Sequence, residues 1–312
     1  MDIIYFPDDP RPASWTHPVL ALGNFDGVHR GHRKILDRLM RVAAERSGTA
    51  VVMTFDPHPP RVVRPDKAPA LLMTTAQKLD AMAAIGVQGA AIVRFTPELS
   101  RWTPDEFVKT VLVDWLRVAE VWVGANFLFG RDRTGNFSLL RTLGGTLGFK
   151  TEKIDPVRYK DFVVSSTRIR RLVAEGRVDE AGALLGHQYY VDGTVTQGDR
   201  RGRTIGFPTA NLCTDNELLP PHGVYATTAT IGGVVRPSIT NVGVRPTVEA
   251  SGRTHVETHI FNFEQNLYGQ LMRVGFVQRI RDERAFESLD ALRTQIGADC
   301  DRARVLFDRL SL

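Results

Sequence analysis

The sequence predicts an α/β protein with two domains: a parallel sheet, followed by a smaller antiparallel β-barrel with a closing helix. From residue 19 to about residue 186, short apolar runs alternate with helical patterns, and this alternation is typical of a parallel sheet. Beyond about residue 187, short strands are separated by glycine and proline, without intervening helices. The 312 residues are enough for two hydrophobic cores. We therefore expect one domain at residues 1–186 and the other at residues 187–312.

The first domain shows its strands as apolar runs and its helices as periodic patterns. Strands are expected at residues 19–22, 50–54, 90–93 and 121–123. A helix should follow the loop after the first strand, because Ile35, Leu36 and Leu39 recur at helical spacing. A second helix is expected at residues 75–85. The segment T-P-D-E at residues 103–106 is a capping box with proline at the first helical position, so another helix should start there.

The second domain shows six short strands and one long helix. The strands are expected at residues 190–196, 209–212, 224–231, 234–239, 255–261 and 271–277. Six short strands joined by turns favour a small antiparallel barrel. Residues 289–310 carry Leu292, Ile296, Ala303 and Leu306 on a helical pattern, so a helix should close the domain.

The composition describes an ordinary globular protein and limits its partners. Apolar residues make up 43% of the chain and charged residues 24%, and the net charge is +5. This modest excess suits anionic small molecules and is too evenly spread to indicate a nucleic-acid surface. The chain shows no basic segment followed by an apolar leader, and no run near the ~18 apolar residues of a membrane span. We expect a cytoplasmic protein without nucleic-acid or membrane partners.

The most informative stretch is G-N-F-D-G-V-H-R-G-H at residues 23–32, between an apolar strand and a helical pattern. Its glycines at positions 23, 27 and 31 let the backbone turn sharply and approach a ligand. A helix that starts near Gly31 turns unpaired N–H groups towards the space above the loop, and such a helix start attracts phosphate. His29 and His32 are spaced to donate hydrogen bonds to phosphoryl oxygens. The stretch therefore predicts a phosphate-binding loop that positions the ligand and stabilises charge.

Two other interpretations of this loop stay open on the residues alone. The loop can serve only to cap a helix, with both histidines as polar surface residues. Alternatively, Asp26, His29 and His32 can form a zinc site, although no H-E-x-x-H motif or cysteine pair accompanies them. The two cysteines, Cys213 and Cys300, lack C-x-x-C spacing and indicate neither a disulfide framework nor a thiolate metal site.

Three further segments of the first domain carry polar side chains at loops or at a helix start. The stretch S-S-T-R-I-R-R at residues 165–171 joins hydroxyls suited to helix capping with guanidinium groups suited to phosphate, although it can serve only to start a helix. His58 lies between two prolines after the second strand, and Asn126 lies in the loop after the fourth. Open α/β sheets bind ligands at this edge, but a rigid turn and a satisfied loop amide explain these two residues equally well.

The second domain has its own polar constellation. The segment at residues 198–211 mixes glycines and arginines, ends in P-T-A-N, and is not a Walker loop. Thr209 and Asn211 lie two apart, hence on one face of an extended strand, and offer hard oxygen ligands for magnesium. Glu257 shares a strand face with His255 and His259, where a carboxylate can take a proton from an attacking alcohol. An arginine-rich surface hairpin and a salt-bridged strand glutamate are the competing interpretations.

The signatures of the first domain resemble those of the nucleotidylyltransferase superfamily, most closely the bacterial FAD synthetases. The resemblance implies a Rossmann-like nucleotidylyltransferase domain in which an FMN phosphate oxygen attacks the α-phosphorus of ATP, with His29 and His32 catalytic. The S-S-T-R segment then closes over the β- and γ-phosphates, and the T-F-x-P-H-P and V-G-x-x-F-x-F-G segments lie around flavin and nucleotide. Leu128 departs from the pattern, because many relatives have a polar or basic residue there. The implied binding residues are Gly23, Phe25, Asp26, Gly31, His58, Asn126, Ser166, Thr167 and Arg168.

The second domain resembles the riboflavin kinases. The resemblance rests on G-x-x-x-G-R-x-x-G-F-P-T-A-N, G-V-Y-A, N-V-G-V-R-P-T and L-Y-G followed by R-D-E, in the family's order. It implies that Gly202 and Arg203 bind the nucleotide, that Thr209 and Asn211 hold Mg²⁺ with ATP, and that Glu257 is the catalytic base. Relatives usually carry a branched or aromatic residue near position 258, where this chain has threonine. Together the two resemblances cover about residues 15–310.

The sequence thus predicts a bifunctional flavin enzyme that phosphorylates riboflavin to FMN in the barrel and adenylylates FMN to FAD in the first domain. Both steps use ATP and magnesium. The alternative is an FMN adenylyltransferase only, with a non-catalytic, regulatory flavin-binding barrel. An oligonucleotide-binding barrel is a third possibility, but it predicts exposed aromatics between basic residues, whereas the arginines here lie mainly in glycine-bearing loops. The sequence does not give the oligomeric state.

Overall fold

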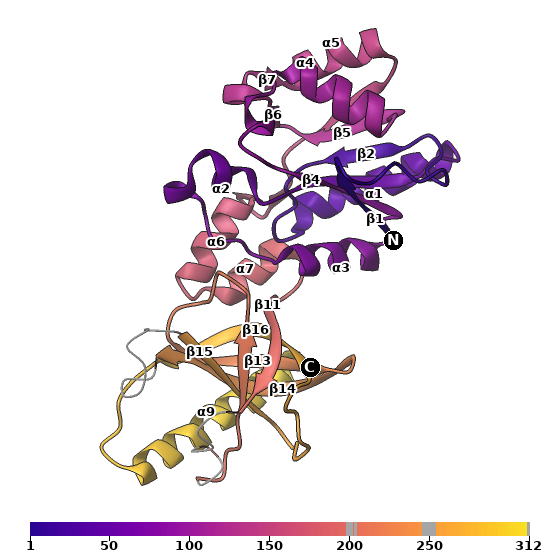
Figure 1. Ribbon diagram of the computed structural model, residues 1–312. Helices are drawn as coiled ribbons and strands as arrows, with labels where there is room; N and C mark the ends of the chain where they lie inside the picture. Colours follow the sequence, from indigo (N-terminus) through magenta and orange to yellow (C-terminus); the bar gives the residue numbers. More distant parts are fainter. Residues whose placement is uncertain (198–201, 203–204, 245–253, 311–312) are drawn as a thin grey trace. The chain divides into compact units, whose positions relative to one another are not determined.

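The computed structural model describes residues 1–197, 202, 205–244 and 254–310. The chain divides into two compact units, one made of Met1–Ala70 and Thr75–Ser165 and the other of Leu71–Thr74 and Ser166–Leu312. The predicted parallel sheet lies in the first unit and the predicted barrel in the second, as Figure 1 shows. The domain boundary at residue 186 stays a prediction.

The first unit is built on a six-stranded parallel sheet with the order β1-β4-β3-β2-β5-β8. Its strands are β1 (Asp2–Phe6), β2 (Val19–Leu22), β3 (Ala50–Asp56), β4 (Gly89–Arg94), β5 (Glu120–Gly124) and β8 (Lys150–Ile154). The four central strands, β4, β3, β2 and β5, are the four that the sequence predicts, so this prediction is confirmed. The sequence does not predict β1 and β8, because these edge strands are largely exposed and lack the continuous apolar run of a central parallel strand.

Three helices of the first unit confirm the predictions. α1 spans Arg30–Glu45, and α3 spans Thr75–Ile85, as predicted. α4 (Pro104–Phe107) begins with the predicted capping box, in which the Thr103 hydroxyl and the Glu106 carboxylate each accept a hydrogen bond from the other residue's backbone N–H. The remaining elements are α2 (Pro59–Val63), η1 (Pro65–Lys67), η2 (Leu99–Arg101), η3 (Val108–Trp115), β6 (Leu128–Phe129), η4 (Arg131–Arg133), β7 (Gly135–Asn136), α5 (Phe137–Leu147), β9 (Arg158–Tyr159) and β10 (Phe162–Val163).

The strand order decides which loops meet. β2 lies between β3 and β5, and all three strands run parallel. The segments that follow them along the chain therefore leave from the same edge of the sheet. Leu20, Val51 and Val121 are fully buried in the core beneath this edge, so the loops rest on a close-packed base.

The second unit is built on a closed antiparallel barrel with the order β11-β12-β15-β14-β13-β16. Its strands are β11 (Tyr189–Thr196), β12 (Ala210–Thr214), β13 (Gly223–Ile231), β14 (Val234–Val244), β15 (Thr254–Ile260) and β16 (Leu271–Asp282). All six predicted strands are confirmed. β14 and β16 continue beyond their predicted ends, because their later residues still pair with β15 and β13 respectively.

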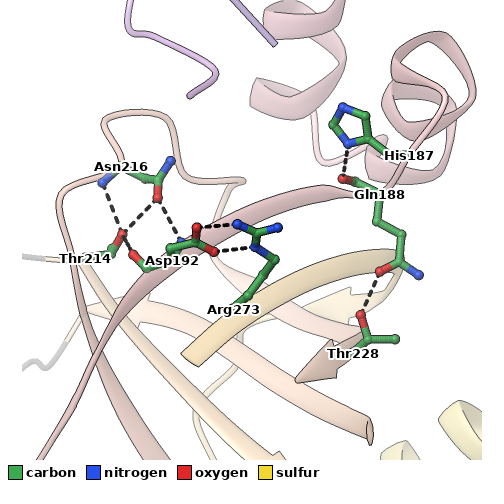
Figure 2. A network of polar contacts seen from close by, with 7 residues as sticks. All are labelled: His187, Gln188, Asp192, Thr214, Asn216, Thr228 and Arg273. Atoms are coloured by element: carbon green, nitrogen blue, oxygen red, sulfur yellow. Dashed lines mark hydrogen bonds and ion pairs between the residues drawn. The ribbon is translucent and has the colours of Figure 1, made fainter. Parts of the chain in front are cut away.

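A polar network, drawn in Figure 2, ties the seam at which β11 pairs with both β12 and β16. Arg273 on β16 donates two hydrogen bonds of 2.7 Å to the Asp192 carboxylate on β11. The same guanidinium lies 3.9 Å from the centre of the Tyr190 ring. Asp192 N–H donates to the Asn216 side chain at 3.0 Å, and Thr214 Oγ1 donates to the Asp192 carbonyl at 2.6 Å. Side chains thus reinforce the backbone pairing that closes the barrel.

Three helices complete the described part of the second unit. α6 spans Ser166–Ala174, and α7 spans Val178–Leu185 and packs against β11 and β16. α9 spans Leu289–Leu310 and confirms the predicted closing helix. It buries Cys300, Ala303 and Phe307 against apolar side chains of the barrel.

Two glycines offer a matched test of the barrel packing. A Cβ on Gly193 of β11 would lie 2.2 Å from the Cys213 carbonyl oxygen of β12, whereas a Cβ on Gly297 of α9 would meet nothing within 4 Å. We expect Gly193→Ala to lower the free energy of unfolding by about 1–3 kcal/mol, because the seam must shift. Gly297→Ala should raise it by about 1 kcal/mol, since alanine favours the helix. Urea unfolding followed by circular dichroism measures both, and equal effects would contradict this account.

Candidate active sites

The loop between β2 and α1 brings the two predicted histidines into contact. His29 is the N-cap of α1, and its Nδ1 accepts a hydrogen bond from the His32 backbone N–H at 3.2 Å. The imidazole rings stack, with centroids 3.6 Å apart and an interplanar angle of 11°. Gly31 permits this arrangement, because a Cβ there would lie 3.1 Å from His29 Cε1. The loop does cap the helix, but it packs the histidines together and leaves His29 only 6% exposed.

The same loop holds two non-glycine residues in the left-handed backbone region. Phe25 has a φ of 51° and Val28 a φ of 38°, and both side chains are buried. Such strain costs free energy and concentrates at ligand-binding sites. The Phe25 ring contacts Gly23 and meets the His32 ring edge-on, with centroids 5.2 Å apart. Asp26, the next residue, is also buried. Phe25 therefore fixes His32 from one side, while His29 fixes it from another.

The surroundings of His32 keep its imidazole neutral. Burial lowers the pKa of His32 well below its usual value, and the neighbouring His29 and the Lys78 ammonium lower it further. Its ring nitrogen Nδ1 is buried and has no hydrogen-bond partner among the residues that the structure describes. A buried polar atom of this kind usually finds a partner, so a ligand oxygen is a natural one.

The zinc interpretation of this loop is not supported. Nowhere in the described ranges do three or more histidine, cysteine, aspartate or glutamate side chains gather in a way that could hold a metal ion. The His29 and His32 rings lie face to face, whereas two imidazoles that share a metal direct their nitrogen lone pairs at one point.

His58 and Asn126 lie in the loops that flank this site along the sheet. His58 precedes α2, directly after β3, and Asn126 follows β5. Leu128, the departure from the family pattern, is 44% exposed in β6, whereas the adjacent Phe127 and Phe129 rings stack with centroids 5.3 Å apart. The structure therefore brings the two loops to the predicted edge, while the binding roles of His58 and Asn126 stay predictions.

The S-S-T-R segment starts a helix, as predicted. Ser166, Thr167 and Arg168 form the first turn of α6 in the second unit, and Ile169 and Leu172 of the same helix are buried. Thr167 is exposed, and Ser166 and Arg168 are half-buried. Their expected contact with the nucleotide phosphates stays a prediction.

In the barrel, the chain before β12 folds back onto Gly202. The Phe207 backbone N–H donates to the Gly202 carbonyl at 2.8 Å. A Cβ on Gly202 would lie 2.4 Å from the Phe207 carbonyl oxygen and 3.3 Å from Thr209 Oγ1, so only glycine fits beside this hydroxyl. Gly202 and Thr209 are therefore neighbours, and their binding roles stay predictions. Arg203 lies outside the described residues.

The strand register aligns the other predicted kinase residues. Asn211 on β12 is paired with Glu257 on β15, and Glu257 is paired in turn with Asn241 on β14. Directly opposed residues have Cβ atoms about 4.5–5.5 Å apart and share one face of the sheet. Three polar side chains thus form a row across three strands, with Glu257 in the middle. Thr209 and Asn211 supply oxygen donors of the kind that magnesium prefers, so the residues present fit this ion.

The alternation predicted for β15 is confirmed. Val256, Thr258 and Ile260 are buried, whereas Glu257 is half-buried on the other face. The unusual Thr258 belongs to a chain of buried hydroxyls inside the barrel. Its Oγ1 lies 2.9 Å from Thr240 Oγ1, and Thr240 Oγ1 lies 2.7 Å from Thr227 Oγ1. Thr258 therefore forms a hydrogen bond to β14.

His259 connects β15 to the P-T-A-N segment. Its Nδ1 lies 2.9 Å from the Pro208 carbonyl oxygen, and its ring meets Phe207 edge-on at 5.5 Å. Burial lowers the pKa of His259, the bond to Pro208 raises it, and Arg304 lowers it, with a net lowering. A neutral His259 thus donates one hydrogen bond that fixes the backbone just before Thr209.

Comparisons with known proteins match both halves of the chain. A family model described as FAD synthetase matches residues 11–168, and one described as riboflavin kinase matches residues 185–307. Two proteins named bifunctional riboflavin kinase/FMN adenylyltransferase are each 39% identical to this chain. The alignment with the Pseudomonas fluorescens protein covers 92% of each chain, and the alignment with the Escherichia coli K12 protein covers 93% of this chain and 92% of that one. The chain belongs to this bifunctional family.

Other members of the bifunctional riboflavin kinase/FMN adenylyltransferase family agree with this assignment. The Bacillus subtilis member is 35% identical over 94% of this chain and 93% of its own. A solved structure described as a macrolide-efflux protein from Streptococcus pneumoniae is 29% identical, covers 97% of this chain and 99% of that one, and gives a TM-score of 0.87. In the described part of the present chain, no helix is both long enough and apolar enough to cross a membrane.

The sequence of this family member assigns no role to three residues near these two sites. Asn241 is paired with Glu257, but only the register reveals it. His259 appears in the sequence only as a polar position on the Glu257 face. Lys78 on α3 contacts the histidine loop, residues 23–32, through the Asn24 carbonyl. The sequence hints at its burial only by its spacing, since Lys78 lies four residues before the buried Met82 and hence on the same helix face.

Proposed function

We propose that the two activities of this bifunctional family are carried in this chain by two separate sites, one built on the histidine loop of the parallel sheet and one on the barrel. As a member of the family, the chain phosphorylates riboflavin to FMN and adenylylates FMN to FAD. The observation that carries the assignment of sites is the cross-strand row of Asn211, Glu257 and Asn241, because it sets a carboxylate beside a predicted magnesium ligand. The stacked histidines at the start of α1 support the other site.

In the adenylyl-transfer site, the FMN phosphate oxygen attacks the α-phosphorus of ATP while the bond to the pyrophosphate leaving group breaks. His29 and His32 stabilise the charge that develops on the phosphoryl oxygens, and the N–H groups at the start of α1 add to this stabilisation. Ser166, Thr167 and Arg168 bind the β- and γ-phosphates. No proton has to leave the attacking phosphate oxygen, so catalysis needs donors and positioning and no strong base.

In the kinase site, Glu257 accepts the proton of the riboflavin primary alcohol as its oxygen attacks the γ-phosphorus of ATP. Gly202 and Arg203 bind the phosphates, and Thr209 and Asn211 hold magnesium. Magnesium, when bound, neutralises phosphate charge. ADP leaves, and Glu257 releases its proton to water.

The second candidate function is FMN adenylyltransferase alone, with a non-catalytic regulatory barrel. The aligned Asn211 and Glu257 argue against it, since a merely flavin-binding barrel needs no carboxylate beside a magnesium ligand. Incubation with riboflavin, magnesium and ATP, followed by separation of FMN from FAD, distinguishes the two candidates. The cytoplasmic location stays a prediction. The use of magnesium in both reactions is part of the present proposal.

His32→Ala should block FAD formation from supplied FMN and leave riboflavin phosphorylation intact. Loss of one preorganised donor to a developing oxyanion costs on the order of a hundredfold or more in rate. The measurement is FAD formation from FMN, with FMN formation from riboflavin in the same preparation as the internal reference. His17→Asn, at an exposed histidine of the same unit, is the matched control. If His32→Ala kept adenylylation within about threefold of the parent, His32 would be structural.

Glu257→Gln should abolish most kinase activity while FMN adenylylation continues. The amide keeps the shape of the side chain and removes its basicity, so the phosphorylation rate should fall at least about 10²-fold. The melting temperature should barely change, because Glu257 is half-buried on the outer face of β15. Glu264→Gln, at an exposed loop glutamate of the same unit, should behave like the parent. An active Glu257→Gln protein would leave proton removal to water or ATP.

The domain boundary can be tested with two fragments, residues 186–312 and residues 166–312. All described kinase residues lie beyond residue 186, so both fragments should make FMN from riboflavin. The longer one should melt several degrees higher, because α7 buries Val178 and Leu184 and packs against β11 and β16. Thermal melts and FMN production measure both expectations. A cooperative melt without FMN production would show that the first unit completes the kinase site.

A further inference from the structure

Lys78 is a buried cation that the mechanism above does not use. It lies on α3 and is 8% exposed, which is rare for a lysine unless it is paired. Its ammonium donates to Thr54 Oγ1 at 2.9 Å and to the Asn24 backbone carbonyl at 3.2 Å. Thr54 Oγ1 itself donates to the same carbonyl at 3.2 Å. Lysine, threonine and carbonyl thus form a closed triangle of hydrogen bonds.

The triangle joins three elements of the first unit. Asn24 is the second residue of the histidine loop, Thr54 belongs to β3, and Lys78 belongs to α3. Asp56, at the end of β3, accepts a hydrogen bond of 3.1 Å from the hydroxyl of Thr75, the first residue of α3. The start of α3 is therefore fixed to β3, and Lys78 extends from this fixed helix to the base of the loop.

Charges of both signs surround the ammonium. Burial lowers the pKa of Lys78, whereas Asp26 in the loop and Asp56 on β3 raise it. These two carboxylates stabilise the charged form, as a buried ammonium requires. Lys78 in turn acts on His32, whose pKa is lowered by burial first, then by His29 and by Lys78. The cation therefore lies within electrostatic range of His32.

We propose that Lys78 is a positioning residue for adenylyl transfer, which anchors the Asn24 carbonyl of the histidine loop and holds one fixed positive charge beside His29 and His32. This inference rests on the role proposed above for His32. Lys78 acts in two separable ways: its hydrogen bonds hold the loop backbone, and its charge adds to the effects of burial and of His29, which lower the pKa of His32. A neutral His32 retains its unpartnered buried Nδ1 for a ligand.

The two effects predict different behaviour of three full-length variants. Lys78→Met removes the charge and the donors, Lys78→Gln keeps an amide donor without the charge, and Thr54→Val removes one partner and leaves the charge. Since the ammonium lowers the pKa of His32, that pKa should rise in both Lys78 variants and stay unchanged in Thr54→Val. The acid limb of kcat/KM for FAD formation should move to higher pH with it. Lys67→Met, at an exposed lysine, is the matched control.

The measurements are an NMR titration of ¹³C-labelled histidine, assigned with His32→Gln, and the pH profile of FAD formation from FMN. We expect Lys78→Met to lower kcat for FAD formation about tenfold or more, with a smaller change in KM, because a displaced loop misplaces the histidines. Lys78→Gln should recover part of kcat while the pKa of His32 stays raised. Riboflavin phosphorylation should remain at the parental rate throughout.

Each outcome decides the proposal. A folded Lys78→Met protein with the parental pKa of His32 and kcat within about threefold would overturn it. If neither Lys78 variant folds while Lys67→Met does, Lys78 serves the fold alone and the proposal is also overturned. The proposed role of His32 can fail separately. If His32→Ala remains active, His32 is not catalytic. If the pKa of His32 is nevertheless raised in Lys78→Met, the electrostatic coupling between Lys78 and His32 still holds.

Discussion

The parallel pairing of β2 with β3 on one side and with β5 on the other is the constraint on which the first site depends. Parallel strands present their carboxyl ends at one edge, so loops distant in sequence meet there. The loop after β2 holds Phe25 and Val28 in a strained backbone, which persists only because the surroundings fix it. β3 contributes Thr54 and Asp56, and α3 contributes Lys78, so two elements of the first unit hold one strained loop.

The second site depends on register. Because successive strand residues face opposite sides, a slip of one position in β15 would bring Thr258 to the place of Glu257. The buried hydroxyls of Thr227, Thr240 and Thr258 form hydrogen bonds across three strands and would lose their partners in such a slip. The interior of the barrel therefore helps to determine which side chains its outer face presents. His259 adds a bond to the segment that carries the proposed magnesium ligands.

The two sites differ in how they handle charge, in accordance with the two reactions proposed. Transfer to a phosphate oxygen needs donors and no base, and the first site offers a neutral, packed histidine pair near a buried ammonium. Transfer to an alcohol needs a proton acceptor, and the second site offers the half-buried Glu257, which stays in contact with solvent. Burial disfavours the charged form of the His32 imidazole.

The sequence by itself determined the four central strands of the sheet, the six barrel strands, the closing helix and the motif residues, because apolar periodicity and local signatures such as H-x-G-H are written in consecutive residues. It missed the edge strands β1 and β8, whose side chains are mostly exposed. Only the tertiary structure paired Asn241 with Glu257 and brought Lys78 to Asn24, 54 positions away. Pairing partners and buried charges depend on contacts between distant segments, and no local pattern specifies which of many possible contacts forms.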